Sequence, residues 1–301
     1  MSIPNRRILL SYFLSVVSCA LLCTGCANRV ATDPAPDIEV AKTLRTTLEK
    51  AGGGVIASVQ VATDVQPTGF ATLKGRFILT GSPPANPANN ITRDLDMCGG
   101  SSTDAQLVVS DEGGIKNVLI YAEQIPEAWV HESAQGKTDD FIFDQKDCVF
   151  LTRVAAFQLS QPMKIMNSDP RGHNTDFEPR YSGSFNQTIP GDGGFAVYQA
   201  EEEEKDPVSV KCAIHPWMQA WVLPRKNAYF AVTDDEGNFE IPSLPAGVDV
   251  SLRAWHERTR GIQNVTLNGE TKKWSKGKFK KLLEADQVLD LQVTIDAAEF
   301  E

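Results

Sequence analysis

The chain has 301 residues, of which 42% are hydrophobic and 23% charged, and it carries a formal net charge of −10. A globular protein of this length has room for a leader and one large or two small domains. The charge excludes nucleic acid as a partner, because phosphate contacts need a clustered excess of Lys and Arg.

A leader opens the chain. Arg6 and Arg7 form a positive region, residues 8–22 are apolar, and small residues precede Cys26. The ending resembles the lipobox of bacterial lipoproteins, although Cys23 stands where Leu is usual. We predict a signal peptide over residues 1–26, removed either at a lipid-anchored Cys26 or by ordinary signal-peptidase cleavage. The protein is then exported, as a periplasmic protein or a membrane-anchored lipoprotein, and meets the membrane only through that anchor.

The body after the leader is predicted to be a tether followed by β-structure. Residues 27–66 form the tether, and residues 38–51 within it are either a short amphipathic helix or a disordered spacer. From Gly69 onward, β-rich runs alternate with turn residues, which is typical of a sandwich or barrel. The candidate strands include residues 73–80, 107–109, 117–121, 148–157, 163–166, 195–198, 208–212 and 221–223.

Three cysteines follow the leader, namely Cys98, Cys148 and Cys212. An oxidising compartment favours the pairing of exposed thiols, and any single disulfide leaves one thiol over. We predict a disulfide between Cys98 and Cys148, with Cys212 reserved for a metal ion, because the neighbourhood of Cys212 supplies further ligands.

Those ligands lie in one short segment. Cys212, His215 and Met218 offer a thiolate, an imidazole and a thioether at the spacing C-x2-H-x2-M, and His173 lies upstream in Gly172-His173-Asn174. Two His and one Cys with a weak axial Met suit both Cu(I) and Cu(II). Zinc also binds Cys and His, but a thioether is a poor ligand for it. The pattern predicts one type 1 copper ion.

Here the sequence resembles the cupredoxin family. The loop reads as in amicyanin, with Cys, two residues, His-Pro, an aromatic residue and Met, and the upstream N-x-D…H-N pattern is similar to that of amicyanin and pseudoazurin. The resemblance implies a Greek-key cupredoxin sandwich, placed over residues 67–227. It also implies that Asn174 ties the first ligand segment to the cysteine loop.

The number of histidines limits which class of copper protein the chain can be. The chain has four His and no H-x-H pair, so it lacks the ligands for the trinuclear cluster of a multicopper oxidase. No catalytic set is recognisable. We therefore predict an electron carrier rather than an enzyme, with a redox protein such as a cytochrome or dehydrogenase as its partner. The alternative is a copper-binding or structural envelope protein without redox turnover.

A partner surface is also predicted. If His215 lies on an exposed loop, Pro216 and Trp217 beside it would form an apolar docking patch. The other possibility is that Trp217 packs inward. The acidic run Glu201 to Glu204 either steers a basic partner or is a solvated loop.

A second module follows over residues 228–298. Its T-D-x-x-G-x-F-x-I…L-P-x-G pattern resembles carboxypeptidase regulatory-like, or transthyretin-like, β-sandwich modules. That family is mainly structural and implies no reaction. Residues 67–123 could supply the opening strands of this module, with the copper domain inserted in it. His256 beside Glu257 is either a second metal site or an exposed pair at the end of a strand.

Overall fold

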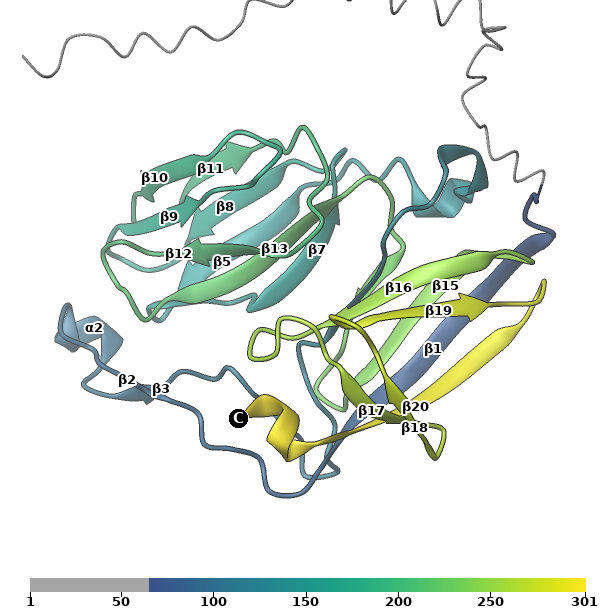
Figure 1. Cartoon of the computed structure of the whole chain (residues 1–301). Coiled ribbons are helices and arrows are strands. Elements are labelled where there is room, and N and C mark those ends of the chain that lie inside the picture. The colour runs from purple at the N-terminus through teal and green to yellow at the C-terminus, as the bar shows by residue number, and fades with distance from the viewer. Residues whose placement is uncertain (1–64) are drawn as a thin grey trace, which may run out of the picture. The chain divides into compact units, whose positions relative to one another are not determined.

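The computed structural model describes residues 65–301, which form an all-β protein of two β-sandwiches (Figure 1). The predicted signal peptide, the Cys26 anchor and nearly all of the tether lie outside the described residues. Within residues 65–301, no helix is both long and apolar enough to cross a membrane.

The first sandwich, here called the inserted sandwich, uses the strands from β5 to β13 in unbroken chain order. Its larger sheet has the order β10-β9-β12-β13-β7 and its smaller sheet the order β11-β8-β5-β6. The chain crosses repeatedly between the two sheets, as in a Greek-key sandwich. The bounds are β5 (Phe141–Lys146), β6 (Val149–Phe150), β7 (Val154–Gln158), β8 (Met163–Asn167), β9 (His173–Phe177), β10 (Phe185–Ile189), β11 (Gly194–Tyr198), β12 (Val208–Lys211) and β13 (Gln219–Arg225).

The second sandwich, here called the flanking sandwich, is formed by strands on both sides of the first. Its sheets have the orders β15-β1-β20-β17-β18 and β14-β4-β16-β19. The bounds are β1 (Gly69–Thr80), β4 (Leu119–Ala122), β14 (Phe230–Val232), β15 (Asn238–Ala246), β16 (Asp249–Trp255), β17 (Asn264–Leu267), β18 (Glu270–Lys273), β19 (Lys278–Leu282) and β20 (Val288–Asp296).

This topology decides a boundary that the sequence leaves open. The cupredoxin-like domain is predicted over residues 67–227, but residues 67–123 are also predicted as possible opening strands of the second module. In the structure β1 pairs with β15 and β20, and β4 pairs with β14 and β16. Residues 67–123 therefore give their long strands to the flanking sandwich, and the inserted sandwich interrupts it between β4 and β14.

A small excursion lies between β1 and β4 in the chain. We call residues 88–103 the cap segment; it contains β2 (Ala88–Asn89), the short helix α2 (Leu95–Cys98) and β3 (Ser102–Thr103). Asp94 precedes α2 with φ 50° and ψ 41°, in the left-handed region that Asp tolerates better than most residues. Cys98 forms a disulfide with Cys148 of the inserted sandwich, as predicted from the cysteine count. The cap segment is thereby fastened to that sandwich.

Burial follows strand position. In β8 the side chains of Met163, Ile165 and Asn167 are buried and the two between them are not, as expected for a strand with one face on a core. All of β4 is buried, because Ile120 faces the flanking core while Leu119 and Tyr121 face the other sandwich. Three 3-10 turns complete the fold of the described residues: Glu127–Trp129, Glu132–Ala134 and Ala297–Phe300.

The sandwiches contact each other through a separate apolar cluster. Trp221 of β13 and Trp255 of β16 lie with ring centroids 5.3 Å apart at its centre. Beside them Arg153 bonds to Glu257 with Nε–Oε1 at 2.7 Å and Nη2–Oε2 at 2.5 Å. Burial of apolar surface together with a buried ion pair joins the two sandwiches.

Candidate metal centre

The four predicted ligands meet at one end of the inserted sandwich. His173 is the first residue of β9, Cys212 directly follows β12, and His215 lies in the loop from β12 to β13. Strands β9 and β12 are antiparallel neighbours, with Lys211 opposite Asp176, so the chain that continues beyond the end of β12 runs alongside the first residues of β9. This pairing brings the upstream histidine to the cysteine loop.

Three of the donor atoms form a compact group. The Nδ1 atoms of His173 and His215 are 2.8 Å apart, and Cys212 Sγ lies 3.9 Å from His215 Nδ1. The ligand atoms of all three residues lie within 4.8 Å of one another, and all three side chains are buried. Such a buried group of one thiol and two imidazoles can hold a metal ion.

The loop that carries three of the ligands is closed by its own backbone. The N–H of Met218 donates to the His215 carbonyl over 2.9 Å, and the N–H of Cys212 donates to the Met218 carbonyl over 3.3 Å. The Met218 side chain is buried and packs in the same core cluster as Cys212. Met218 therefore lies in the same closed loop and the same core cluster as the thiol of Cys212.

Two carboxylates hold the outer edges of the histidine rings. Asp169 Oδ2 lies 2.6 Å from His173 Nε2, and Asp94 Oδ2 lies 2.8 Å from His215 Nε2. A neutral histidine that donates from Nε2 has no hydrogen on Nδ1. The two Nδ1 lone pairs then face each other, an arrangement that a cation between them stabilises. The donor set fits a metal ion for this reason.

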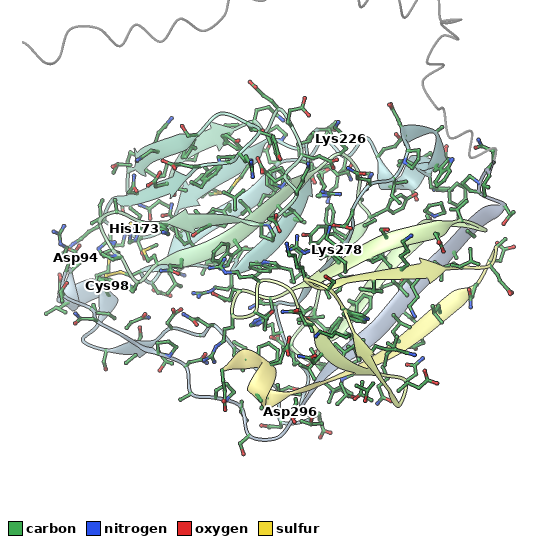
Figure 2. All side chains as sticks on the ribbon, viewed as in Figure 1. Asp94, Cys98, His173, Lys226, Lys278 and Asp296 are labelled. Carbon is green, nitrogen blue, oxygen red and sulfur yellow. A yellow bond between two sulfur atoms is a disulfide. The ribbon has the colours of Figure 1, made fainter. Side chains whose placement is uncertain are left out.

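Both carboxylates were missed by the sequence analysis. Asp169 stands inside the N-x-D pattern that precedes His173, which was a usable signal. Asp94 lies far upstream on the cap segment, and nothing in the pattern around it points to His215. Figure 2 shows Asp94, Cys98 and His173 at the same end of the inserted sandwich.

The charge states of these groups follow from their contacts. The hydrogen bonds to His215 and then to Arg171 lower the pKa of Asp94. Burial raises the pKa of Asp169, but the hydrogen bonds from the Cys148 N–H, from His173 and from the Asp147 N–H outweigh it, and the pKa is lowered. For His173 burial acts in the other direction and lowers the pKa, and the hydrogen bond to Asp169, which raises it, is the weaker influence. These shifts favour ionised carboxylates and a neutral His173.

Asn174 lies where the cupredoxin resemblance placed it. Its backbone N–H donates to Cys212 Sγ over 3.3 Å, and its Oδ1 accepts from the N–H of Ala213 over 3.0 Å. Its Nδ2 donates to Asn186 Oδ1 and to the Gln187 carbonyl. The residue thus ties β9 and β10 to the cysteine loop.

The predicted docking patch is wrong. His215 is 0% exposed because Asp94 covers its ring edge, and Trp217 is only 9% exposed. The Trp217 ring packs inward and its Nε1–H donates to the Cys148 carbonyl over 3.2 Å. Of the two residues proposed for the patch, Pro216 alone is exposed.

The two other charged features also differ from expectation in part. Glu201 and Glu202 are exposed, but Glu204 is buried and accepts from the N–H of Tyr181 over 2.7 Å. His256 and Glu257 are buried, so they are not an exposed pair. Glu257 is bonded to Arg153 and is unavailable as a partner of His256 in a second metal site.

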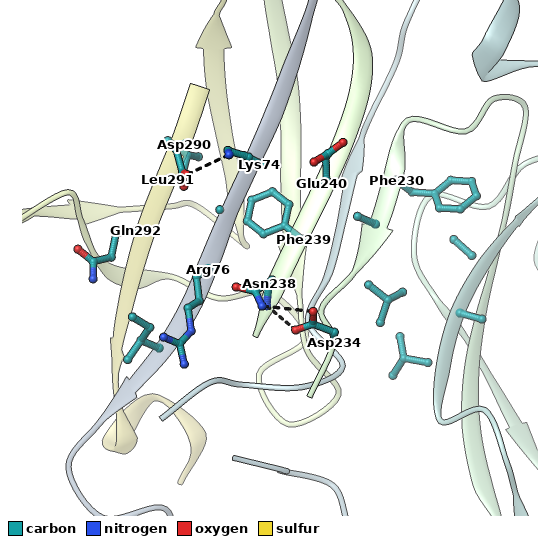
Figure 3. Close-up of a pocket in the computed structure, with 17 residues that line it drawn as sticks. Lys74, Arg76, Phe230, Asp234, Asn238, Phe239, Glu240, Asp290, Leu291 and Gln292 are labelled. Carbon is teal, nitrogen blue, oxygen red and sulfur yellow. Dashed lines mark hydrogen bonds and ion pairs between the residues drawn. The ribbon is translucent and has the colours of Figure 1, made fainter. Parts of the chain in front are cut away.

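A large surface pocket lies away from these ligands. It has a volume of about 950 Å³ and is lined by strands that include β7, β14 and β15, each at a sheet edge. Figure 3 shows Lys74 paired with Asp290, and Asn238 bonded to Asp234, on its walls. The lining contains no His or Cys, so the pocket is not part of the metal centre.

A comparison with protein-family models found no match, and neither did one with curated protein sequences. Among solved structures, an oxidised amicyanin variant is 12% identical, with 29% of this chain and 82% of that chain covered and a TM-score of 0.26. Amicyanin from Paracoccus versutus is 17% identical over 36% of this chain and 99% of that chain, with a TM-score of 0.24. A copper-containing nitrite reductase from Thermus scotoductus is 14% identical over 29% and 22%, with a TM-score of 0.25. These similarities are too slight to indicate a function. The case for a metal centre rests on the contacts among His173, Cys212 and His215.

Proposed function

We propose that the chain binds one type 1 copper ion and carries single electrons between redox partners. The observation that carries this proposal is the buried group of His173, Cys212 and His215, whose Nδ1 and Sγ atoms converge. Met218 is the proposed axial ligand, since it lies in the same closed loop and the same core cluster.

The donor types favour copper. A thiolate and a thioether bind Cu(I) well, two imidazoles bind Cu(II), and copper held by this mixed set supplies reversible one-electron chemistry. Each histidine ring is oriented by a carboxylate at its Nε2 atom. The sulfur of Cys212 accepts hydrogen bonds from the backbone N–H groups of Asn174 and His215. Residues held in this way before metal binding move little when the charge of the centre changes, which speeds electron transfer.

We also infer that the protein works outside the cytoplasm, in the bacterial envelope, as an electron carrier rather than an enzyme. The Cys98–Cys148 disulfide supports export, since disulfides persist in oxidising compartments. The partner we propose is a redox protein such as a cytochrome or a dehydrogenase. Because His215 is covered, such a partner meets the cap segment or the surface around Pro216, not a bare imidazole edge.

The test is the spectrum of the protein loaded with Cu(II). We expect an intense visible thiolate-to-copper charge-transfer band that disappears and returns on one-electron reduction and reoxidation. Cys212→Ser abolishes the band, whereas Met163→Leu, a change at another buried side chain of the same core, keeps it. Copper binding without a visible band or reversible reduction would favour the alternative, a copper-binding envelope protein without redox turnover.

A further inference from the structure

The cap segment reaches over the histidine end of the metal centre. Asp94 contacts His215 Nε2 with Oδ2 at 2.8 Å, and its other oxygen pairs with Arg171. Arg171 also binds Asp96 over 2.5 Å. A carboxylate from a segment remote in sequence thus covers the ring edge of a proposed ligand, while Asp96 of the same short helix remains exposed.

The Cys98–Cys148 disulfide connects the two carboxylates that hold the histidines. Cys98 is the last residue of α2, the helix that Asp94 precedes. On the other side, the N–H of Cys148 donates to Asp169 Oδ2 over 2.9 Å, and that same oxygen contacts His173 Nε2. The disulfide therefore joins the cap segment to the loop that supports the first ligand.

Resting on the copper function proposed above, we propose that Asp94 is a positioning residue of the metal centre, held on His215 by the Cys98–Cys148 disulfide, and that its carboxylate stabilises the more highly charged oxidation state of copper. A carboxylate on Nε2 keeps Nδ1 directed at the ion and makes the imidazole a stronger donor. A negative charge close to the centre also favours Cu(II) over Cu(I) and lowers the reduction potential.

The chain offers a matched control for the charge. Asp94→Asn and Asp96→Asn remove the same charge from the same segment, and both aspartates bind Arg171, but only Asp94 contacts a histidine. In the copper-loaded protein we expect Asp94→Asn to shift the Cu(II)/Cu(I) stability ratio about tenfold toward Cu(I), a rise of about 59 mV in the potential. We expect less than about a twofold change for the exposed Asp96→Asn. Equal shifts in the two variants, or none in either, would overturn the proposal.

A second probe separates this proposal from the copper function. Co²⁺ titration follows metal binding without any redox step, and loss of an outer carboxylate weakens metal affinity by about 10- to 100-fold. If Asp94→Asn weakens Co²⁺ binding in this way but the copper form shows no reversible reduction, the positioning role stands and the electron-carrier function fails. If the visible copper band forms but both variants keep the parental potential and Co²⁺ affinity, the positioning role fails and the function stands.

The part played by the disulfide has its own test. In Cys98→Ala/Cys148→Ala, adding Asp94→Asn should produce less than about half of the shift it produces in the parent, because the carboxylate is no longer held in place. A fully additive shift would show that the disulfide does not position Asp94. Treatment of the folded parent with a phosphine reductant, followed by Co²⁺ titration, gives the same comparison if the double variant folds poorly; an unchanged affinity there contradicts the proposal.

Discussion

The backbone N–H of Asn174 donates to Cys212 Sγ, and the Asn174 side chain holds the same loop through the N–H of Ala213. Asn174 is buried, so replacing it by alanine leaves the Ala213 N–H and the Gln187 carbonyl without their partner. We expect Asn174→Ala to lower the free energy of unfolding of the metal-free protein by about 2 kcal/mol, measured by urea denaturation. Asn264→Ala, at an exposed residue, should cost less than about 0.5 kcal/mol. Equal losses would mean that the loop is not held by this side chain.

Met218→Leu tests the axial ligand. The change conserves volume in the core, so the free energy of unfolding should fall by less than about 1.5 kcal/mol. The lost thioether no longer donates electron density to Cu(II), and the reduction potential of the copper form should rise. Met163→Leu, at a buried methionine of the same core cluster, is the control and should leave the potential unchanged. An unchanged potential in Met218→Leu would remove Met218 from the ligand set.

Arg153→Met tests the junction of the two sandwiches. Arg153 bonds to Glu257 and lies 2.8 Å from Asp104, and removing it deprives both carboxylates of this ion-pair partner. Loss of one partner of a buried pair costs about 3 to 5 kcal/mol, which we expect in chemical denaturation. Lys74→Met breaks the exposed pair with Asp290 and should cost less than about 1 kcal/mol. A loss that small in Arg153→Met would show that the ion pair contributes little to the junction.

The buried His256 should make the stability of the fold sensitive to acid. Burial, aided by Arg258 and Arg153, lowers the pKa of His256 from 6.5 to about 3, and its Nε2 has no hydrogen-bond partner. Below pH 6.5 His256 is therefore protonated in the unfolded chain, whereas in the folded chain it stays neutral until about pH 3. The free energy of unfolding falls as the pH drops through this window. This group should account for about 3 kcal/mol of stability lost between pH 7 and pH 4.

The check is the pH dependence of the free energy of unfolding in the metal-free protein. His256→Gln should have a flatter curve between pH 7 and pH 4, even if its stability at pH 7 is lower. Parallel curves for the parent and His256→Gln would contradict the assignment.

Local patterns predicted much of the fold. The T-D-x-x-G part of the second-module pattern forms a turn, with the N–H of Gly237 bonded to the Asp234 carbonyl and Gly237 at φ 82°. The run over residues 148–157 was expected as one strand but forms β6 and β7, and residues 107–109 contribute only an isolated bridge at Val109. Strand propensity alone does not decide whether a partner strand is present to pair with.

The ligand residues of the candidate site were predictable from local sequence, but the residues around them were not. Cys212, His215 and Met218 lie in one short loop, so their small separation in the sequence keeps them close together in space. The disulfide followed from counting the cysteines that come after the predicted leader. Asp94 could not be found this way, because its contact with His215 depends on how the cap segment folds back, and the docking patch failed because that same contact covers the imidazole.

By itself the sequence determined the donor types, since thiolate, thioether and imidazole are properties of the residues and a short loop keeps them together. Only the tertiary structure decided what surrounds those donors. Pairing of β9 with β12 brings His173 to the loop, and the course of the cap segment brings Asp94 to His215. Charge, burial and solvent access at the centre depend on contacts between segments far apart in the chain, which no local pattern encodes.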